Sequence, residues 1–348
     1  MIGLKIIILQ DGGEGDDGDK ELTSLRDLGE LQVIRIMERT FGTSTRTVVG
    51  FGDDISVVKL TPNRLAVLKT DMLVGSTDVP PGMTMRQTAR KAVVANVSDL
   101  AAKGARPYAG LVALGLPPNL TKQDIQGIAA GLAGAAKEYG FPIVGGDTNE
   151  SKDLTISIAL LAIAKRRQLV LRSGARVGDI VAVTGEFGAA SAGLKALLKK
   201  RLRPASLAPE LSRAVYKPRA ELKLGLALAA SSALTASIDS SDGLAWSLHE
   251  LSQASNIGIE ITRIPISKTA RAFAARYHYK ASDLALYGGE EYNLVVTVKP
   301  NKFNQARRAA HGRLMPIGVV TPKSQGVRLR EAGGYSEIPM KGWEHFKS

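Results

Sequence analysis

The chain has 348 residues, of which 44% are hydrophobic and 23% charged, as expected for a globular protein with a sizeable core. It contains no cysteine, which excludes disulfides, thiolate metal sites and a cysteine nucleophile. With only four histidines, any bound metal should have carboxylate ligands and be a hard cation such as Mg²⁺. No stretch has the length of a membrane span, and residues 2–9 lack a cleavage site, so we expect a cytoplasmic protein without a membrane partner.

The formal charge of +13 comes from 46 Lys and Arg against 33 Asp and Glu. Such a balance is compatible with nucleic-acid binding, but also with a small anionic substrate. The basic residues are scattered, aromatic residues make up only 5%, and the densest basic run, residues 199–203, is typical of a solvated helix end. We therefore expect that no nucleic acid is required, while a basic surface with a second partner stays open.

Residues 1–21 are interpreted as a flexible N-terminal extension, because residues 10–20 are polar, Gly-rich and acidic. Gly13, Gly15 and Gly18 formally match the dinucleotide-binding fingerprint. Four acidic neighbours would repel a pyrophosphate, and no amphipathic helix begins at Gly18, so this match is rejected.

A first domain is expected over residues 22–165, and a basic link at residues 165–167 leads into a second over residues 166–348. Strands and helices do not strictly alternate, which favours two α+β domains over a doubly wound sheet. In the first domain the patterns predict helices at 22–41, 88–107 and 121–139, and strands at 47–49, 55–60, 64–69, 109–116, 141–144 and 155–164. In the second they predict strands at 179–184, 236–238, 258–261 and 294–298, helices at 189–200, 220–231 and 244–255, and a loop between Pro204 and Pro209.

Acidic residues recur at five places, and four of them are predicted at a strand end or a tight turn. The fifth, Asp99, lies in an apolar helix, where it shares a face with Asn96 and Lys103. One such Asp is typical of a turn. Five together suggest carboxylates that converge on more than one Mg²⁺, and therefore on a polyphosphate such as ATP. The five places are Asp53-Asp54, Asp71, Asp99, Asp147, and Asp239 with Asp242.

The common phosphate-binding motifs are absent: there is no Walker A loop and no protein-kinase motif set. The motifs that are present resemble those of the thiamine-monophosphate kinases, in the superfamily that includes aminoimidazole ribonucleotide synthetase. The resemblance covers residues 22–346. Its motifs are Gly52-Asp-Asp54, Thr70-Asp71, residues 91–105, Gly145-Gly-Asp-Thr148, residues 172–179, Thr184-Gly-x-x-Gly188, residues 238–244, Gly288-Gly-Glu-Glu-Tyr292 and His345-Phe346.

The resemblance implies a two-domain fold of mixed sheets flanked by helices, with the N-terminal domains pairing in a homodimer. It implies Mg²⁺-dependent, in-line transfer of the γ-phosphoryl group of ATP to thiamine monophosphate, with several Mg²⁺ ions and no covalent enzyme intermediate. The implied metal ligands are Asp54, Thr70, Asp71, Asp99, Asp147, Asp239 and Asp242. The implied ATP contacts are Gly146, Asp147, Arg172 and Ser241, and the implied substrate contacts are Asp78, Glu290 and Trp343.

Two departures from the family pattern bear on the substrate. The bacterial pattern has a His where this chain has Asp78, and Glu291 replaces an Asp. The rivals are other ATP enzymes of the superfamily and a basic nucleic-acid-binding module. The members that use cysteine or selenocysteine are excluded because the chain has no cysteine, and residues 288–292 with Trp343 favour the thiamine enzyme over the purine-pathway synthetase.

Overall fold

The structure, a computed structural model, describes residues 25–42, 44–62, 64–199 and 205–342. The predicted extension with its Gly-rich match, most of the basic run at 199–203, and Trp343 lie outside the described residues. The described chain falls into two units, helix α1 and the part from residue 44 onward. α1, Leu25–Phe41, confirms a helix in this region, but the helix is interrupted at Gly29, whose φ of 68° costs glycine little.

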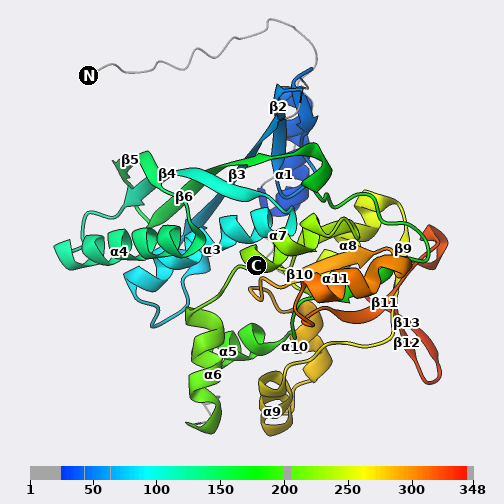
Figure 1. The fold of residues 1–348 in the computed structure, drawn as a ribbon. Helices are drawn as coiled ribbons and strands as arrows, with labels where there is room; N and C mark the ends of the chain where they lie inside the picture. Colours follow the sequence, from blue (N-terminus) through cyan, green and yellow to red (C-terminus); the bar gives the residue numbers. More distant parts are fainter. Residues whose placement is uncertain (1–24, 43, 63, 200–204, 343–348) are drawn as a thin grey trace, which may run out of the picture. The chain divides into compact units, whose positions relative to one another are not determined.

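The first half of the larger unit forms a six-stranded sheet in the order β1-β2-β3-β6-β4-β5 (Figure 1). Neighbouring strands are antiparallel except β4 and β5, which are parallel. The strands are β1 (Thr47–Val49), β2 (Ser56–Thr61), β3 (Arg64–Val74), β4 (Arg106–Leu116), β5 (Ile143–Glu150) and β6 (Thr155–Ala164).

Helices cover one face of this sheet: α3 (Met85–Ala102) packs against β3 and β6, and α4 (Lys122–Tyr139) packs against α3 (Figure 1). A single turn, α2 (Gly75–Asp78), precedes them. A capping box begins each long helix, with Thr84 and Gln87 in α3. Gly131 allows the two helices to approach closely, since a Cβ there would lie 2.3 Å from the carbonyl oxygen of Arg86. Gly131 is therefore a packing residue, whereas a Cβ at Gly134 would have no atom within 4 Å.

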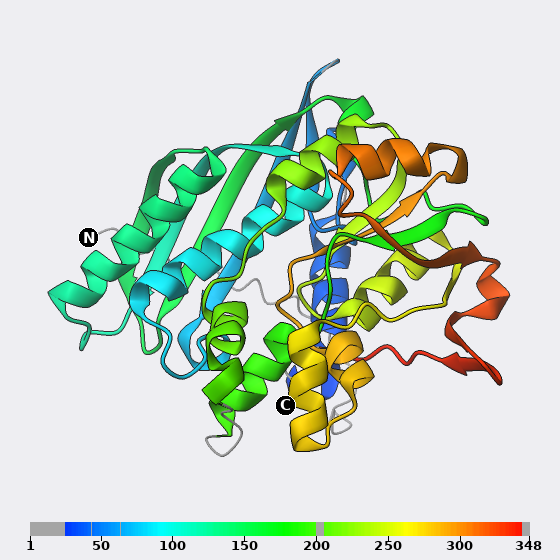
Figure 2. The same ribbon diagram turned by 60° about the horizontal axis from the view of Figure 1, so that its bottom comes forward.

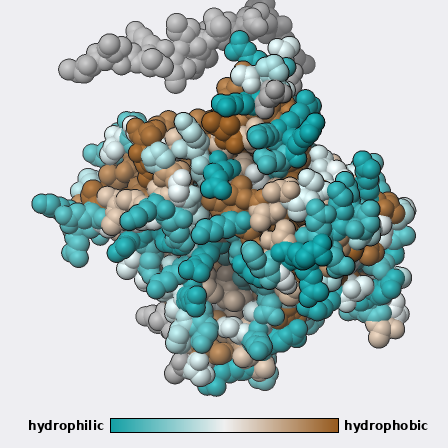
Figure 3. Space-filling model, viewed as in Figure 1, coloured by the Kyte–Doolittle hydropathy of each residue, from teal (hydrophilic) through white to brown (hydrophobic). Residues whose placement is uncertain are grey.

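The described residues of the larger unit leave much of the other face of the sheet exposed, and this is called the open face below. Along β3, Leu68, Thr70 and Met72 are exposed, and they alternate with the less exposed Lys69 and Asp71 on the helix-covered side. Figure 3 shows hydrophobic side chains gathered over β4 and β5 in the view of Figure 1. The exposed apolar side chains of this open face are Leu68, Met72, Leu111, Val144 and Ile163.

The second half of the larger unit forms a seven-stranded sheet in the order β13-β12-β9-β11-β7-β10-β8. Only β9 and β12 are parallel neighbours. Its strands are β7 (Ile180–Val183), β8 (Leu234–Asp239), β9 (Gly258–Ile261), β10 (Leu294–Val298), β11 (Met315–Thr321), β12 (Val327–Glu331) and β13 (Gly334–Glu337). Its helices are α5 (Ala189–Leu198), α6 (Ala208–Tyr216), α7 (Leu222–Ala230), α8 (Leu244–Ser255), α9 (Lys268–Tyr277), α10 (Ala281–Tyr287) and α11 (Phe303–Ala309).

Helix α3 lies between the two halves (Figure 2). It packs against α7 so closely that a Cβ at Gly225 would lie 2.0 Å from the carbonyl oxygen of Ala101. At its C-terminal end the ammonium of Lys103 donates to the carbonyl oxygen of Ser237 in β8, at 2.6 Å. α3 is therefore buried on nearly all sides, which explains why its sequence lacks a broad polar stripe.

The predicted α+β class with mixed sheets flanked by helices is confirmed, and the strands at 258–261 and 294–298 and the helix at 244–255 have the predicted bounds. Three local predictions are wrong. Strands β3 and β5 do not end before Asp71 and Asp147 but continue through them, because long antiparallel and parallel partners supply their hydrogen bonds. The central helix runs from Met85 to Ala102, since Thr84 caps it and Gly104 adopts a φ of 67°. Finally, the described part of the loop predicted between Pro204 and Pro209 is a 3-10 turn, Ala205–Leu207, followed directly by α6.

Candidate active site

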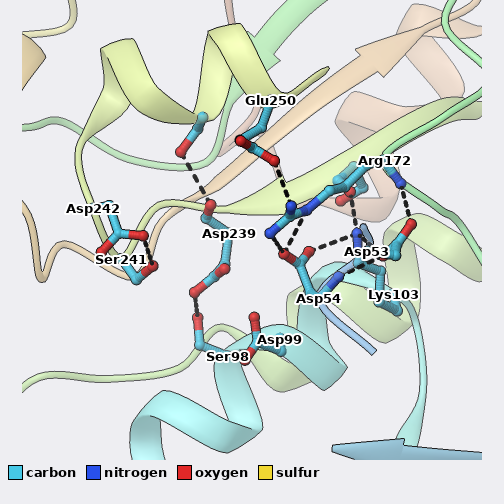
Figure 4. A network of polar contacts seen from close by, with 12 residues as sticks. Asp53, Asp54, Ser98, Asp99, Lys103, Arg172, Asp239, Ser241, Asp242 and Glu250 are labelled. Atoms are coloured by element: carbon cyan, nitrogen blue, oxygen red, sulfur yellow. Dashed lines mark hydrogen bonds and ion pairs between the residues drawn. The ribbon is translucent and has the colours of Figure 1, made fainter. Parts of the chain in front are cut away.

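Three carboxylates from distant parts of the chain meet beside α3. Asp54 follows a turn before β2, Asp99 lies on α3, and Asp239 ends β8 (Figure 4). Each can offer an oxygen atom such that the three oxygens lie within 4.8 Å of one another, and all three residues are buried. Such a cluster is costly without counter-charges, protons or a metal ion, so the surrounding groups decide its chemistry.

Two cations hold Asp54. Lys103, which is fully buried, lies 2.6 Å from Asp54 and 2.9 Å from Asp53. The Nε of Arg172 donates to Asp54 Oδ1 at 2.7 Å, and its backbone N–H donates to Asp53 at 2.9 Å. Burial alone would raise the pKa of Asp54, but the charges of Lys103 and Arg172 outweigh it and lower this pKa to about 2. Asp54 is therefore ionised at any physiological pH.

Asp99 and Asp239 have weaker compensation. Burial raises the pKa of Asp99 well above its usual value. The charge of Lys69 lowers this pKa only in part, and the neighbouring carboxylates raise it further. Burial and the charge of Asp54 raise the pKa of Asp239 to about 6, although Ser98 donates a hydrogen bond to it at 2.6 Å. Both carboxyl groups therefore hold a proton to a higher pH than a free aspartate does, and a bound cation would favour their ionised form.

The predicted ligands on β3 lie on opposite faces of its sheet. Asp71 is on the helix-covered face, where Lys69 bridges it to Asp99 with contacts of 2.8 and 2.6 Å. The backbone N–H of Asp71 donates to the side-chain oxygen of Asn96 at 2.9 Å, which gives a position to a residue that the sequence left without a definite role. Thr70 is on the open face.

Asp147 does not join the buried cluster. It lies on the edge strand β5, is exposed, and pairs with Ala113 of β4, which is exposed on the open face. In the strand order, β4 and β6 separate β5 from β3. Its neighbour Gly146 meets β4 so closely that a Cβ there would lie 1.8 Å from the carbonyl oxygen of Val112, so this position excludes any side chain.

The loop after β8 carries Ser241 and Asp242, whose side chains lie 3.2 Å apart in a hydrogen bond (Figure 4). These two residues follow Asp239 closely in the sequence, but Asp242 is not one of the three residues whose carboxylate oxygens converge. The backbone N–H of Glu290 donates to the carbonyl oxygen of Ser241 at 2.6 Å, so the segment after α10 is joined to this loop. Glu290 itself adopts a φ of 66°, an uncommon conformation for a non-glycine residue.

Lys91 joins two of the predicted substrate contacts. This buried ammonium forms an ion pair with Glu290 and donates to the carbonyl oxygen of Asp78 at 2.6 Å. The carboxylate of Asp78 accepts the backbone N–H of Val74 at 2.7 Å, so it is already used within its own loop. The third predicted contact, Trp343, lies outside the described residues.

A cavity of about 680 Å³ opens beside the cluster. Apolar side chains of the open face line most of it, including Leu68, Leu111 and Val144, while Asp54 and Thr70 contribute polar groups. This volume is in the range of small-molecule sites.

The sequence interpretation missed several charged partners of the cluster. Lys69 could have been found, because it lies two residues before Asp71 in a strand and therefore on the same face. Glu250 could not. It forms an ion pair with Arg172 from helix α8, and nothing in the local sequence marks it. Burial and the charge of Arg172 act in opposite directions on Glu250, and its pKa is raised.

The donor set fits a hard divalent cation. Three converging carboxylates offer only oxygen ligands, and burial and neighbouring carboxylates raise the pKa values of two of them, Asp99 and Asp239. Within the described part of the chain, no other group of three or more His, Asp or Glu side chains converges in this way. No helix in that part of the chain is long and apolar enough to cross a membrane.

Comparison with known proteins points to one family. The model of the AIR synthase related protein, N-terminal domain, matches residues 52–164, and that of the C-terminal domain matches residues 176–330. A thiamine-monophosphate kinase of Nitrosopumilus maritimus is 34% identical over 92% of this chain and 99% of its own length. One from Pyrococcus horikoshii is 35% identical over 91% and 96%.

Solved structures agree with these matches. The structure of AaThiL complexed with AMPPCP and TMP has a TM-score of 0.83 and 28% sequence identity, and the match covers 94% of this chain and all of the other. The two family models match in chain order, and the relatives match over nearly the full length. The fold also matches, so sequence and structure agree. The chain belongs to the thiamine-monophosphate kinase family, within the AIR synthase-related superfamily.

Proposed function

We propose that this protein is an ATP-dependent thiamine-monophosphate kinase, which transfers the γ-phosphoryl group of ATP to thiamine monophosphate and forms thiamine diphosphate. The buried meeting of Asp54, Asp99 and Asp239 is the observation that carries the proposal. Membership in the family and the cavity beside these residues support it.

The reaction brings two anions together, and the proposed role of the site is to reduce their repulsion. The acceptor is a phosphate whose oxygen is anionic near neutral pH, so it needs no strong base to expose a nucleophile. Direct in-line transfer, without a covalent enzyme intermediate, is therefore proposed. Among the residues that converge here, Arg172 and Lys103 hold the carboxylates, and Arg172 retains a partly exposed guanidinium toward an incoming phosphate.

Several Mg²⁺ ions are proposed as the metal, because the donor set is made of hard oxygen ligands. When bound, they would screen the negative charge that develops during transfer. The proposed ligands are Asp54, Thr70, Asp71, Asp99, Asp147, Asp239 and Asp242. The proposed ATP contacts are Gly146, Asp147, Arg172 and Ser241, and the proposed substrate contacts are Asp78, Glu290 and Trp343. We also retain the division into domains at residues 22–165 and 166–348 as a proposal.

A homodimer is proposed because of the open face of the six-stranded sheet. Exposed apolar residues on one sheet face, such as Leu111 at 51% exposure and Met72 at 61%, favour a partner that covers them. Thr70 and Asp147 lie on this same face but on strands that β4 and β6 separate. Their proposed roles in one metal site are easiest to meet if each comes from a different chain of the dimer.

One assay tests the activity. Purified protein is incubated with ATP, Mg²⁺ and thiamine monophosphate, and thiamine diphosphate is measured by chromatography. Formation of thiamine diphosphate that stops when EDTA is added is the expected result. If the product is absent while the protein is folded and metal is present, the proposed activity is wrong.

A mixed dimer tests the shared site. Chains with Asp99→Asn and chains with Asp147→Asn are co-expressed with different tags, and the heterodimer is isolated through both tags. If the two residues of one site come from different chains, one of the two sites is intact, and about half of the wild-type activity should return. Activity is compared at an ATP concentration well below the wild-type KM, where both single variants are weak. If each site lies within one chain, the heterodimer stays as weakly active as those variants.

A further inference from the structure

Lys69 occupies an unusual place for a lysine. It lies in the middle of β3, and only 12% of its side chain is exposed. Its ammonium lies 2.8 Å from Asp71 Oδ1 and 2.6 Å from Asp99 Oδ2. Ordering a long side chain between two carboxylates costs conformational entropy, which these two ion pairs must offset.

The charges around the cluster divide into separate groups. Asp54 has Lys103 and Arg172, and Glu290 has Lys91. Within residues 44–62, 64–199 and 205–342, Lys69 is the cation in ion-pair contact with Asp71 and Asp99. Removal of its charge would leave Asp71 and Asp99 without this cation, and Asp99 lies beside Asp54 and Asp239.

The contacts of Lys69 leave part of each carboxylate available. It takes one oxygen of Asp71 and one oxygen of Asp99, while the second oxygen of each is not in an ion pair with it. A divalent cation that bound these two carboxylates would share them with the ammonium and would be repelled by it.

We propose that Lys69 is a built-in cation of the carboxylate cluster, which neutralises Asp71 and Asp99 and weakens their hold on divalent cations. The inference rests on the proposed function, since it takes these carboxylates as metal ligands. Lys69 therefore has a positioning role. Its ammonium stabilises the arrangement of the carboxylates and repels divalent cations until bound substrates add the negative charge of their phosphates.

Binding of Mn²⁺ in the absence of nucleotide tests this role. Free Mn²⁺ is measured by electron paramagnetic resonance during titration of the wild type, Lys69→Met and Lys69→Arg. Methionine keeps the length of the stem without the charge, whereas arginine keeps the charge. Lys59→Met is the matched control, because Lys59 is exposed on the neighbouring strand β2.

We expect Lys69→Met to bind Mn²⁺ about tenfold more tightly than the wild type, because one repelling charge is gone. Lys69→Arg and Lys59→Met should stay within about twofold of the wild type. Unchanged or weaker Mn²⁺ binding by folded Lys69→Met would overturn the proposal and leave Lys69 with a purely structural role.

Folding of the variant gives a second decision. If Lys69→Met does not fold in EDTA, it should fold in excess Mg²⁺, because the metal replaces the missing charge. Failure to fold in both conditions contradicts the proposal. None of these results depends on thiamine diphosphate formation, so a failure of the proposed activity would be seen separately in the kinase assay.

Discussion

The two faces of the six-stranded sheet differ in how their polar and charged side chains are held. On the helix-covered face, Asp71 is already held by Lys69 and Asn96 and lies beside the buried carboxylates. On the open face, Thr70 and Asp147 are exposed, and Asp147 forms no ion pair within the described residues. The covered face is held by contacts within the chain, whereas we propose that a ligand or a second chain completes the open face.

This difference has a physical cause. A strand alternates its side chains between two faces, so Thr70 and Asp71 must separate although they are adjacent in sequence. Only the face that packs against α3 can bury charge, because α3 and β8 bring the partners that buried charges require. Thr70 and Asp71 of one motif therefore lie in different surroundings: Asp71 is paired with Lys69, and Thr70 is exposed.

The largest effect should come from the covered face. Asp99→Asn removes a carboxylate from the centre of the cluster but keeps its size. We expect kcat to fall on the order of 10²–10³-fold while the far-ultraviolet circular dichroism stays unchanged. Near-normal turnover of this variant would show that Asp99 has no part in the reaction and that the covered face is only structural.

The next effect concerns stability. Lys103→Met leaves Asp53 and Asp54 with Arg172 as their remaining partner in a buried place. We expect the free energy of unfolding to fall by about 3 kcal/mol, measured by urea denaturation at neutral pH. Lys59→Met, with the same change on an exposed strand, should change stability by less than about 0.5 kcal/mol. Equal effects of the two variants would mean that the covered face is not held by its cations.

The open face should respond through substrate affinity. Asp147→Asn is expected to raise the KM for ATP about tenfold or more with a small change in stability, because the residue is exposed and is proposed to contact the nucleotide. Steady-state kinetics over a range of ATP concentrations measures this. A large loss of stability instead would place Asp147 with the buried group and remove the contrast between the faces.

Glu291, a carboxylate outside both faces, should affect stability only through its titration. Burial raises the pKa of Glu291 to about 7, although backbone N–H groups at the start of α5, including that of Ala190 at 3.0 Å, act against this. Since its pKa is higher in the folded state than the ordinary value, its protonated form favours folding at low pH. That contribution is complete below about pH 4.5 and is lost as the pH rises through 7.

Glu291→Gln should remove this pH dependence. The variant should be more stable than the wild type at pH 8 by on the order of 2 kcal/mol, and similar to it near pH 4.5. Thermal denaturation at a series of pH values measures the difference. A parallel offset of the two curves at every pH would show that the charge of Glu291 has no part in it.

Residue patterns predicted much of this molecule, and the reason is local. The α+β class, the helix at 244–255 and the strands at 258–261 and 294–298 follow from apolar spacing and turn residues, which act over a few positions. The five acidic places were visible because carboxylates in and around apolar segments are costly and therefore stand out. The spacing on α3 even placed Asn96, Asp99 and Lys103 on one side of the helix.

The tertiary structure decided the rest. The ends of β3 and β5 depend on partner strands that the local sequence does not contain, so Asp71 and Asp147 were expected at strand ends or tight turns and lie within strands. Likewise, the partners of the buried carboxylates come from far along the chain: Ser98 meets Asp239, and Arg172 meets Asp54 and Glu250. The sequence by itself determined which residues could carry charge into the core. Only the packing of α3 between the two sheets decided which charges meet there, because electrostatic compensation depends on distance in space and not on distance along the chain.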